Sequence, residues 1–134
     1  MFVDANVIID TLNNDEVWGE WLLARLQECS ANHDLVINHI IYAELAARYS
    51  TAEEVDKMLE GLELEIIDLP KEAAFLAGKA FAQYRKNGGT KTNVLSDFFI
   101  GAHAQVMGVP ILTRDVRRYR SYFPDVPLVA PTVQ

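Results

Sequence analysis

Cysteine is nearly absent from this sequence of 134 residues, in which Cys29 stands alone. A single cysteine excludes an intrachain disulfide and any zinc site built from several cysteines, so we interpret it as an inert core thiol. Long hydrophobic runs are also missing, because charged or polar residues interrupt every apolar stretch well before the roughly 18 residues that a membrane span needs. No basic segment precedes an apolar run at the N-terminus. We therefore expect a cytoplasmic protein without a targeting sequence.

Basic residues are in deficit, with 12 Lys and Arg against 19 Asp and Glu and a formal net charge of −7. This balance disfavours a nucleic-acid partner, since proteins that bind nucleic acids usually present a basic face. The deficit is uneven along the chain: residues 1–77 carry a net charge of −12, whereas residues 78–134 carry +5. The C-terminal part can therefore offer a local surface that attracts phosphate, and the alternative is a solvated surface with uneven charge.

Short apolar runs alternate with helical patterns along the whole chain. The pattern predicts strands near residues 2–4, 35–37, 64–69, 110–112 and 128–130, and helices near 5–12, 17–29, 39–49, 51–61, 70–88, 94–107 and 116–122. Parallel neighbouring strands need helical crossovers, so this order predicts an α/β fold, a three-layer sandwich with a mainly parallel central sheet flanked by helices. We expect one domain over residues 1–134.

Two acidic residues lie where predicted strands end. Asp4 closes the first strand, and Asp115 follows the fourth strand after Thr113. Ligands of parallel α/β sheets bind in the crevice beyond the carboxyl ends of the strands, so both carboxylates can face that crevice. Asp is also a favoured N-cap residue, which leaves helix capping as the alternative for each.

Two further acids lie inside predicted helices that are otherwise apolar: Glu44 in IIYAELAA and Asp97 in VLSDFFIGAHA. A buried ionised carboxylate is costly unless it is paired, and the small residues Gly101 and Ala104 on the face of Asp97 leave room for a partner. The partner is either a bound cation or a basic side chain such as Arg48.

The identity of such a cation follows from the ligands on offer. The three histidines, His33, His39 and His103, show no zinc-binding spacing, and no cysteine pair exists. The remaining ligands are hard oxygens, which favour Mg²⁺ or Mn²⁺.

Four segments together carry a family resemblance: FVDANVIID, IIYAEL, LSDFFIGAHA and ILTRDVRRYRSYFPDVPLVAP. In order and approximate spacing, they resemble the successive motifs of the PIN domain over nearly the whole chain. The compact length and the LTRD segment most resemble the VapC toxins of bacterial and archaeal toxin–antitoxin pairs.

The resemblance implies a metal-dependent endoribonuclease that uses Mg²⁺ or Mn²⁺ and leaves a 5′-phosphate and a 3′-hydroxyl. It implies metal coordination by Asp4, Asp97 and Asp115, with Glu44 completing the acidic pocket directly or through water. Whether one ion or two act stays open. The family motifs also include polar residues that orient a ligand, water or phosphate, here Asn6 and Thr113. Asp10, near the first motif, we interpret as a surface or capping residue.

Two groups of basic residues flank these motifs. Arg85, Lys86 and Lys91 surround a glycine-bearing loop before Asp97, and Arg114 begins a run of arginines around Asp115 that includes residues 117, 118 and 120. We expect contacts with RNA phosphates here; favourable interaction with helix dipoles is the alternative. Single-stranded or loop RNA is the expected substrate, because its bases are exposed.

A VapC-like toxin would also bind an antitoxin protein and a second copy of the chain, forming a homodimer. The resemblance points to the N-terminal helices as the docking surface, which include Trp18 and Trp21. Aromatic side chains anchor interfaces, although at this helical spacing a place in the core is the alternative for both tryptophans.

Two other functions compete with the nuclease. A phosphatase of the haloacid dehalogenase type uses an Asp at the end of its first strand as nucleophile and a nearby second Asp, but Asn6 stands at that second position and no suitable lysine motif is found. A catalytically silent PIN module would act through RNA or protein contacts alone, against which stands the presence of all four acids.

Overall fold

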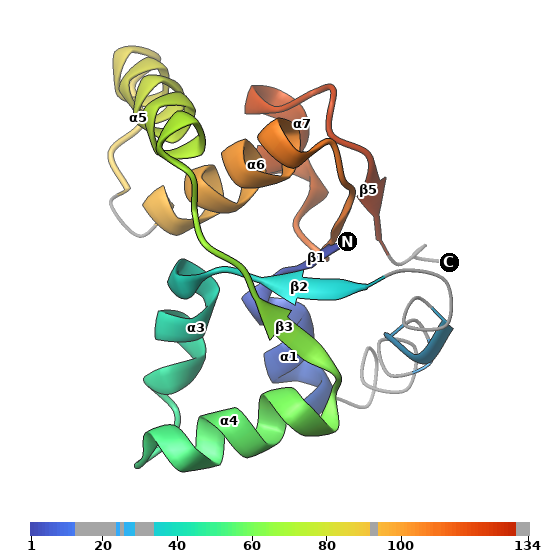
Figure 1. Ribbon diagram of the computed structural model, residues 1–134. Coiled ribbons are helices and arrows are strands. Elements are labelled where there is room, and N and C mark those ends of the chain that lie inside the picture. Colours follow the sequence, from blue (N-terminus) through green and yellow to red (C-terminus); the bar gives the residue numbers. More distant parts are fainter. Residues whose placement is uncertain (13–23, 25, 29–33, 92–93, 131–134) are drawn as a thin grey trace.

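The computed structural model describes residues 1–12, 24, 26–28, 34–91 and 94–130 (Figure 1). The interpretations of Trp18, Trp21, Cys29 and His33 lie outside these ranges. So does most of the helix predicted over residues 17–29, of which residues 24 and 26–28 are described as helical.

A single parallel sheet organises the described chain. Its strands run in the order β3-β2-β1-β4-β5, and every neighbouring pair is parallel, which confirms the predicted sheet. The strands are β1 (Phe2–Val3), β2 (Leu35–Ile37), β3 (Leu64–Ile66), β4 (Ile111–Leu112) and β5 (Leu128–Val129). The first strand of the sequence therefore lies in the middle, between β2 and β4.

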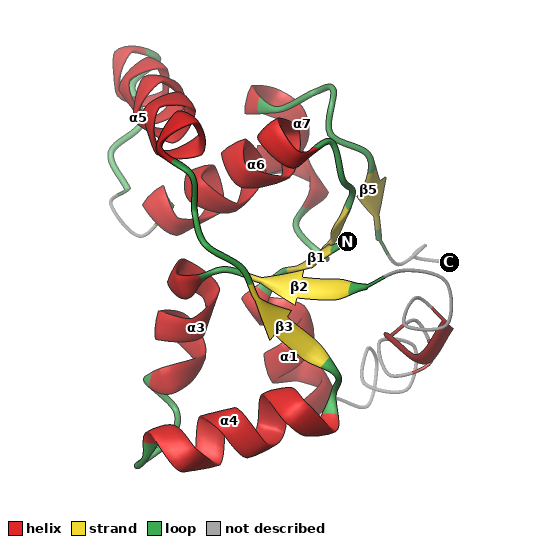
Figure 2. Ribbon diagram, in the orientation of Figure 1, coloured by secondary structure: helices red, strands yellow, loops and turns green. Residues whose placement is uncertain are grey.

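Helices cover both faces of this sheet, as the predicted three-layer sandwich requires. Figure 2 shows α1, α3 and α4 on one side of the strands and α5, α6 and α7 on the other. Their bounds are α1 (Ala5–Leu12), α3 (His39–Ala46), α4 (Ala52–Gly61), α5 (Lys71–Lys86), α6 (Leu95–Met107) and α7 (Val116–Tyr122).

Local signals explain where several helices begin and end. Thr51 caps α4 by accepting a hydrogen bond from the backbone N–H of Glu54 at 3.2 Å, as is typical of a threonine at this position, and the helix predicted near residues 51–61 begins here. Gly108 ends α6 with φ 68°, a left-handed conformation that glycine adopts without the steric cost of a Cβ.

Two predicted elements are shorter in the structure. Strand β3 ends at Ile66 instead of residue 69, because its partner β2 offers only three residues for pairing. Helix α3 ends at Ala46 instead of residue 49. The apolar pattern continued past both ends because the following residues still pack against the core, as Ile67, Leu69 and Tyr49 do.

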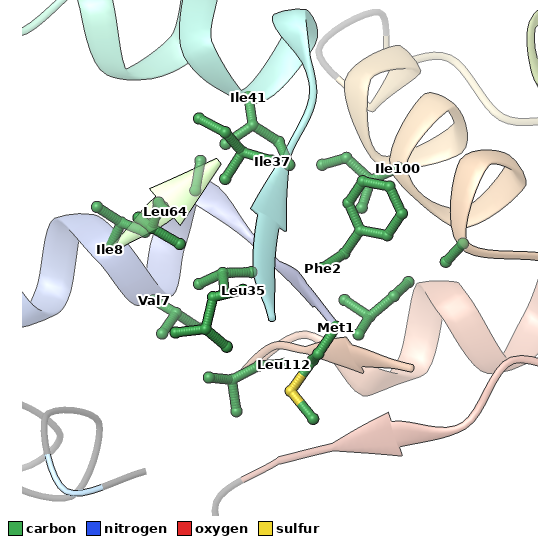
Figure 3. Packing of buried hydrophobic residues seen from close by; sticks show 14 of the residues in the cluster. Met1, Phe2, Val7, Ile8, Leu35, Ile37, Ile41, Leu64, Ile100 and Leu112 are labelled. Atoms are coloured by element: carbon green, nitrogen blue, oxygen red, sulfur yellow. The ribbon is translucent and has the colours of Figure 1, made fainter. Parts of the chain in front are cut away.

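The core lies around the central strands. Phe2 and Val3 of β1 are fully buried, as expected for a strand with a helical layer on each face. Figure 3 shows side chains of β1 and β2 packed between α1 and α6, with Phe2 near Ile100 of α6. This packing fixes the carboxyl end of β1 relative to the helices that follow it.

A buried polar pair joins two of the helices. Asn38 caps α3 by accepting a hydrogen bond from the backbone N–H of Ile41 at 3.0 Å, and its Nδ2 lies 3.2 Å from Nδ1 of His103 in α6. Both side chains have no exposed surface. The pair thus sets α3 against α6, the two helices that carry Glu44 and Asp97.

None of the helices in the described ranges is both long enough and apolar enough to span a membrane.

Candidate active site

Asp4 lies at the carboxyl end of β1 and is almost fully buried, with 3% of its surface exposed. Its Oδ2 accepts hydrogen bonds from the hydroxyl of Thr113 at 2.8 Å and from the phenol of Tyr119 at 3.0 Å. The backbone carbonyl of Asp4 begins α1 by accepting from Val7 at 3.1 Å. Asp4 therefore occupies the start of a helix, as the capping alternative expected, but these two bonds hold its carboxylate toward the end of the neighbouring strand.

Thr113 connects two of the acidic residues. It follows β4, which lies next to β1, and its side chain is fully buried. Its Oγ1 accepts a hydrogen bond from the backbone N–H of Asp115 at 3.0 Å while donating to Asp4. Because both lone pairs and the proton have limited directions, this arrangement fixes the Asp115 backbone relative to the Asp4 carboxylate.

Asp97 and Asp115 share a basic partner. Nη1 of Arg118, in α7, contacts Oδ2 of Asp97 in the first turn of α6 and lies 3.3 Å from Oδ2 of Asp115. Asp115 stands at the N-cap position of α7 yet makes no side-chain capping bond. The basic side chain that pairs with Asp97 is thus Arg118, whereas Arg48 was the example named from the sequence.

Two buried oxygen atoms near these acids lack a hydrogen-bond partner. They are Oε1 of Glu44, in α3, and Oδ1 of Asn6, in the first turn of α1. A buried polar atom without a partner pays its full desolvation cost. Such acceptors fit a site in which a cation or a water molecule supplies the missing interaction.

The electrostatics show how close the acids are. The pKa of Asp97 is raised to about 6, mainly by burial and by the charge of Asp4, with a smaller increase from Asp115 and against a lowering by Arg118. Burial also raises the pKa of Asp4, against the hydrogen bonds from Thr113 and Tyr119, and the charge of Glu44 adds to the rise.

Glu44 belongs to the same electrostatic cluster. Burial raises its pKa, a hydrogen bond with Ser96 lowers it, and the charge of Asp97 raises it again. The charge of Glu44 therefore acts on Asp4, and that of Asp97 on Glu44, while Asp97 itself responds to Asp4 and Asp115. The four acids come from four separate places in the chain, and their role as a site stays a prediction.

Two side chains in contact with these acids were not predicted in that role: Tyr119 was not considered, and Arg118 was named only among the arginines expected to contact RNA phosphates. Tyr119 is 1% exposed, and burial together with the nearby charge of Asp4 raises its pKa well above 10, so the phenol remains a hydrogen-bond donor. The available signal was helical spacing, since residues three and four positions after Asp115 share its side of a helix. Because α7 contains three arginines and two tyrosines, the sequence did not show which of them face the acids.

One expectation about space was wrong. Gly101 was expected to leave room for a partner of Asp97, but the ring of Phe123 fills that room: a Cβ on Gly101 would lie 2.3 Å from Cδ2 of Phe123. The small residue serves helix packing. Asp97 instead faces Arg118.

Three of the residues predicted to contact phosphate, Arg85, Lys86 and Lys91, lie at the end of α5 and in the loop that follows it. Arg85 and Lys86 are in the last turn of α5, where the guanidinium of Arg85 lies 5.1 Å from the centre of the Phe81 ring. The backbone N–H of Lys91 donates to the phenol of Tyr84 at 3.1 Å. These side chains and Arg114 are exposed, and their contact with RNA stays a prediction. The side chain of Asp10 lies outside the description.

The donor set fits a hard divalent cation better than a soft one. All four acids, together with Asn6 and Thr113, present oxygen, the ligand that Mg²⁺ and Mn²⁺ prefer, and two of these oxygens are buried without a partner. Over the ranges that are described, no three Asp, Glu, His or Cys side chains form a ready-made metal cage.

A parallel α/β sheet with carboxylates gathered at the carboxyl ends of its central strands defines a class of proteins that bind ligands at this edge. The model of the PIN domain matches residues 1–124. The chain belongs to the PIN domain family.

Several solved structures of VapBC have the same fold. They include VapBC2 from Rickettsia felis bound to a DNA fragment from its promoter (TM-score 0.73, 20% identity) and DNA-bound VapBC from Salmonella typhimurium (0.70, 24%). VapBC-1 from nontypeable Haemophilus influenzae is similar as well (0.69, 22%). In each comparison, 96% of both chains is covered. At these identities the similarity concerns the fold. No sequence among the curated proteins matches this chain.

Proposed function

We propose that this protein is a metal-dependent endoribonuclease that hydrolyses RNA phosphodiesters. The observation that carries the proposal is the cluster of Asp4, Glu44, Asp97 and Asp115, whose charges interact at the carboxyl edge of the sheet. A structural role alone would not gather four acids and leave a buried carboxylate oxygen without a partner.

Asp4, Asp97 and Asp115 are the residues that would hold Mg²⁺ or Mn²⁺, with Glu44 contributing directly or through water. A bound divalent cation supplies charge stabilisation to the phosphate and activates water. The chain contributes the positions of the ligands: Thr113 and Tyr119 orient the Asp4 carboxylate.

The basic residues of the C-terminal part would attract the RNA backbone. Arg85, Lys86, Lys91 and Arg114 are exposed and belong to the part of the sequence with net charge +5. Such contacts fix the position of the RNA without reading its bases. Single-stranded or loop RNA is the proposed substrate.

We propose that this protein acts in the cell as the toxin of a toxin–antitoxin pair. The structures similar in fold are titled as VapBC complexes and as a toxin–antitoxin complex from Klebsiella pneumoniae. By this analogy the partners are an antitoxin protein and a second copy of the chain, in the cytoplasm. We also propose that residues 1–134 form one domain.

The test is cleavage of a single-stranded RNA by the purified chain with Mn²⁺ or Mg²⁺ and with EDTA. We expect cleavage with metal, none with chelator, and a loss of roughly a hundredfold or more in Asp97→Asn, as when a metal ligand is removed. Asp125→Asn is the matched control, since Asp125 is exposed. RNA binding without metal-dependent cleavage would favour the silent module instead.

A further inference from the structure

We propose that the guanidinium of Arg118 is a resident counter-cation of the carboxylate site and that a divalent cation displaces it on binding. The inference rests on the proposed function, because it takes Asp97 and Asp115 as metal ligands. It adds a residue that the family motifs did not assign, and it gives the metal-free and metal-loaded states different positions for the same side chain.

The contacts of Arg118 carry the argument. A single nitrogen, Nη1, contacts Oδ2 of Asp97 and lies within hydrogen-bond distance of Oδ2 of Asp115. These two carboxylates come from the start of α6 and from the residue before α7, two helices that pack against each other (Figure 1). A cation that takes either oxygen competes with the guanidinium, because both are attracted to the same lone pairs.

Charge favours the exchange. The single positive charge of the guanidinium is shared between two carboxylates, those of Asp97 and Asp115, when Arg118 is the partner. A divalent cation brings twice the charge in a smaller radius and a stronger interaction with each carboxylate. A monovalent partner in this place therefore stabilises the empty site moderately and gives way to a divalent ion.

The surroundings give Arg118 a place to go. Its side chain is 26% exposed, and Asp115 beside it is 41% exposed, so the pair opens toward solvent. Next to it lies a groove of about 210 Å³ lined by Tyr84, Asp115, Arg117, Arg118, Ser121 and Tyr122. Arginine is long, flexible and suited to bidentate contact with phosphate. Once displaced, Arg118 joins Arg117 on this groove as a phosphate-binding group beside the metal.

The first test compares Mn²⁺ affinity in the full chain by calorimetry or electron paramagnetic resonance. We expect Arg118→Gln to bind Mn²⁺ about tenfold more tightly than the parent, the size of one lost charge-assisted pair. Arg117→Gln is the matched control, with the same loss of charge on the neighbouring residue of α7, and we expect it to change affinity about twofold or less. Equal tightening in both variants, or weaker binding in Arg118→Gln, overturns the proposal.

The second measurement observes the side chain itself in the parent protein, which removes any concern about folding of the variant. Arginine side-chain NMR signals are followed as diamagnetic Mg²⁺ is added, with the Arg118 signal assigned from Arg118→Lys. We expect the Arg118 guanidinium signals to shift and to exchange faster with solvent, while those of Arg117 change less. An Arg118 signal that stays unchanged while Mg²⁺ binds overturns the displacement.

Failure of the proposed function gives a different result. If the parent and Asp97→Asn bind Mn²⁺ equally weakly, no metal site exists at these acids and the nuclease proposal fails. If the parent binds Mn²⁺ and Asp97→Asn does not, but Arg118→Gln binds no more tightly than the parent, the metal site stands and the displacement is wrong.

Discussion

The phenol of Tyr119 donates a hydrogen bond to Oδ2 of Asp4 at 3.0 Å, although 115 positions separate the two residues. Both are buried, at 1% and 3% exposed surface. The bond joins the last helix of the fold to the end of its first strand. It holds the carboxylate that has the least contact with solvent in a single orientation.

Tyr119→Phe tests this bond with almost no change in shape. A hydrogen bond to a buried charged group contributes about 1 to 3 kcal/mol to stability, and loss of a partner that orients a ligating carboxylate costs roughly tenfold to a hundredfold in metal affinity or activity. We expect losses in these ranges in denaturant unfolding and in Mn²⁺-dependent cleavage. Tyr122→Phe, on the same helix and half-buried, is the control. Equal effects in both variants would show that the Tyr119 phenol has no special role.

The pKa of Asp97 predicts how the stability of the metal-free protein depends on pH. The folded-state pKa of about 6 is above the ordinary 3.8, so the folded state holds this proton more tightly than the unfolded chain does. Stability from this group is therefore present at low pH, is lost as pH rises from about 4 to 6, and is missing at neutral pH.

Asp97→Asn removes this titration at similar size. In chelator, we expect the variant to melt at least as high as the parent at pH 7 and to lose that advantage as the pH falls below about 4, where Asp97 of the parent becomes protonated in the unfolded state as well as in the folded state. Thermal melts at several pH values measure the difference. A variant that melts several degrees below the parent at pH 7 would mean that the ion pair with Arg118 outweighs the burial of charge.

His103 predicts a pH dependence of the opposite sign. Its ring is buried, lies tilted against the Phe2 ring with centroids 4.6 Å apart, and accepts a hydrogen bond at Nδ1 from the amide of Asn38. Burial lowers the pKa of His103 below 6.5, so the folded state prefers the neutral ring, and stability is lost as pH falls below about 6.5. We expect His103→Gln to reduce stability at pH 7 and to lessen that decline.

The control for this experiment is His39→Gln, since His39 is exposed. It should unfold like the parent between about pH 5 and pH 7. The measurement is the free energy of unfolding in denaturant across this range. An identical pH profile of stability for the parent and His103→Gln would show that His103 does not cause the loss of stability at lower pH.

Two glycines in helices predict opposite responses to alanine. A Cβ on Gly101 would meet the ring of Phe123 at 2.3 Å, whereas a Cβ on Gly78 has no neighbour within 4 Å. We expect Gly101→Ala to destabilise by about 1 to 3 kcal/mol through overpacking, and Gly78→Ala to stabilise by about 0.5 to 1 kcal/mol through helix propensity. Unfolding free energies of both variants check this, and a neutral Gly101→Ala would show that Phe123 moves easily.

The end of α5 gives a prediction for RNA binding. Arg85→Ala with Lys86→Ala should weaken binding of a single-stranded RNA and flatten the dependence of affinity on salt by about one to two released ions. Lys71→Ala with Lys79→Ala removes the same charge from the same helix nearer its start and should leave the slope nearly unchanged. Fluorescence anisotropy over a salt series measures the RNA affinity of both double variants. Equal salt slopes would show that Arg85 and Lys86 are solvated surface residues without a role in RNA binding.

The order of helices and strands and the parallel sheet could be predicted from the sequence alone. Local signals were sufficient for this, as in the cap of α4 at Thr51 and the end of α6 at Gly108, because each depends on a few adjacent residues. The sequence also predicted the four acids as site residues. Asp4 follows a strand and Asp97 interrupts an apolar helix, and both features can be recognised without knowing tertiary contacts. That these acids act as a catalytic site remains a prediction.

The side chains that contact those acids could be identified only from the tertiary structure. The contacts of Tyr119 with Asp4 and of Arg118 with Asp97 join residues 115 and 21 positions apart, and no local pattern distinguishes them from the neighbouring tyrosine and arginines of α7. The need for a glycine at position 101 likewise depends on the ring of Phe123, which is distant in the sequence and close in space. Periodicity tells which face of a helix is apolar, but the partner of a polar atom is set by how separate elements pack, because the energy of a hydrogen bond or ion pair depends on distances that only the folded chain defines.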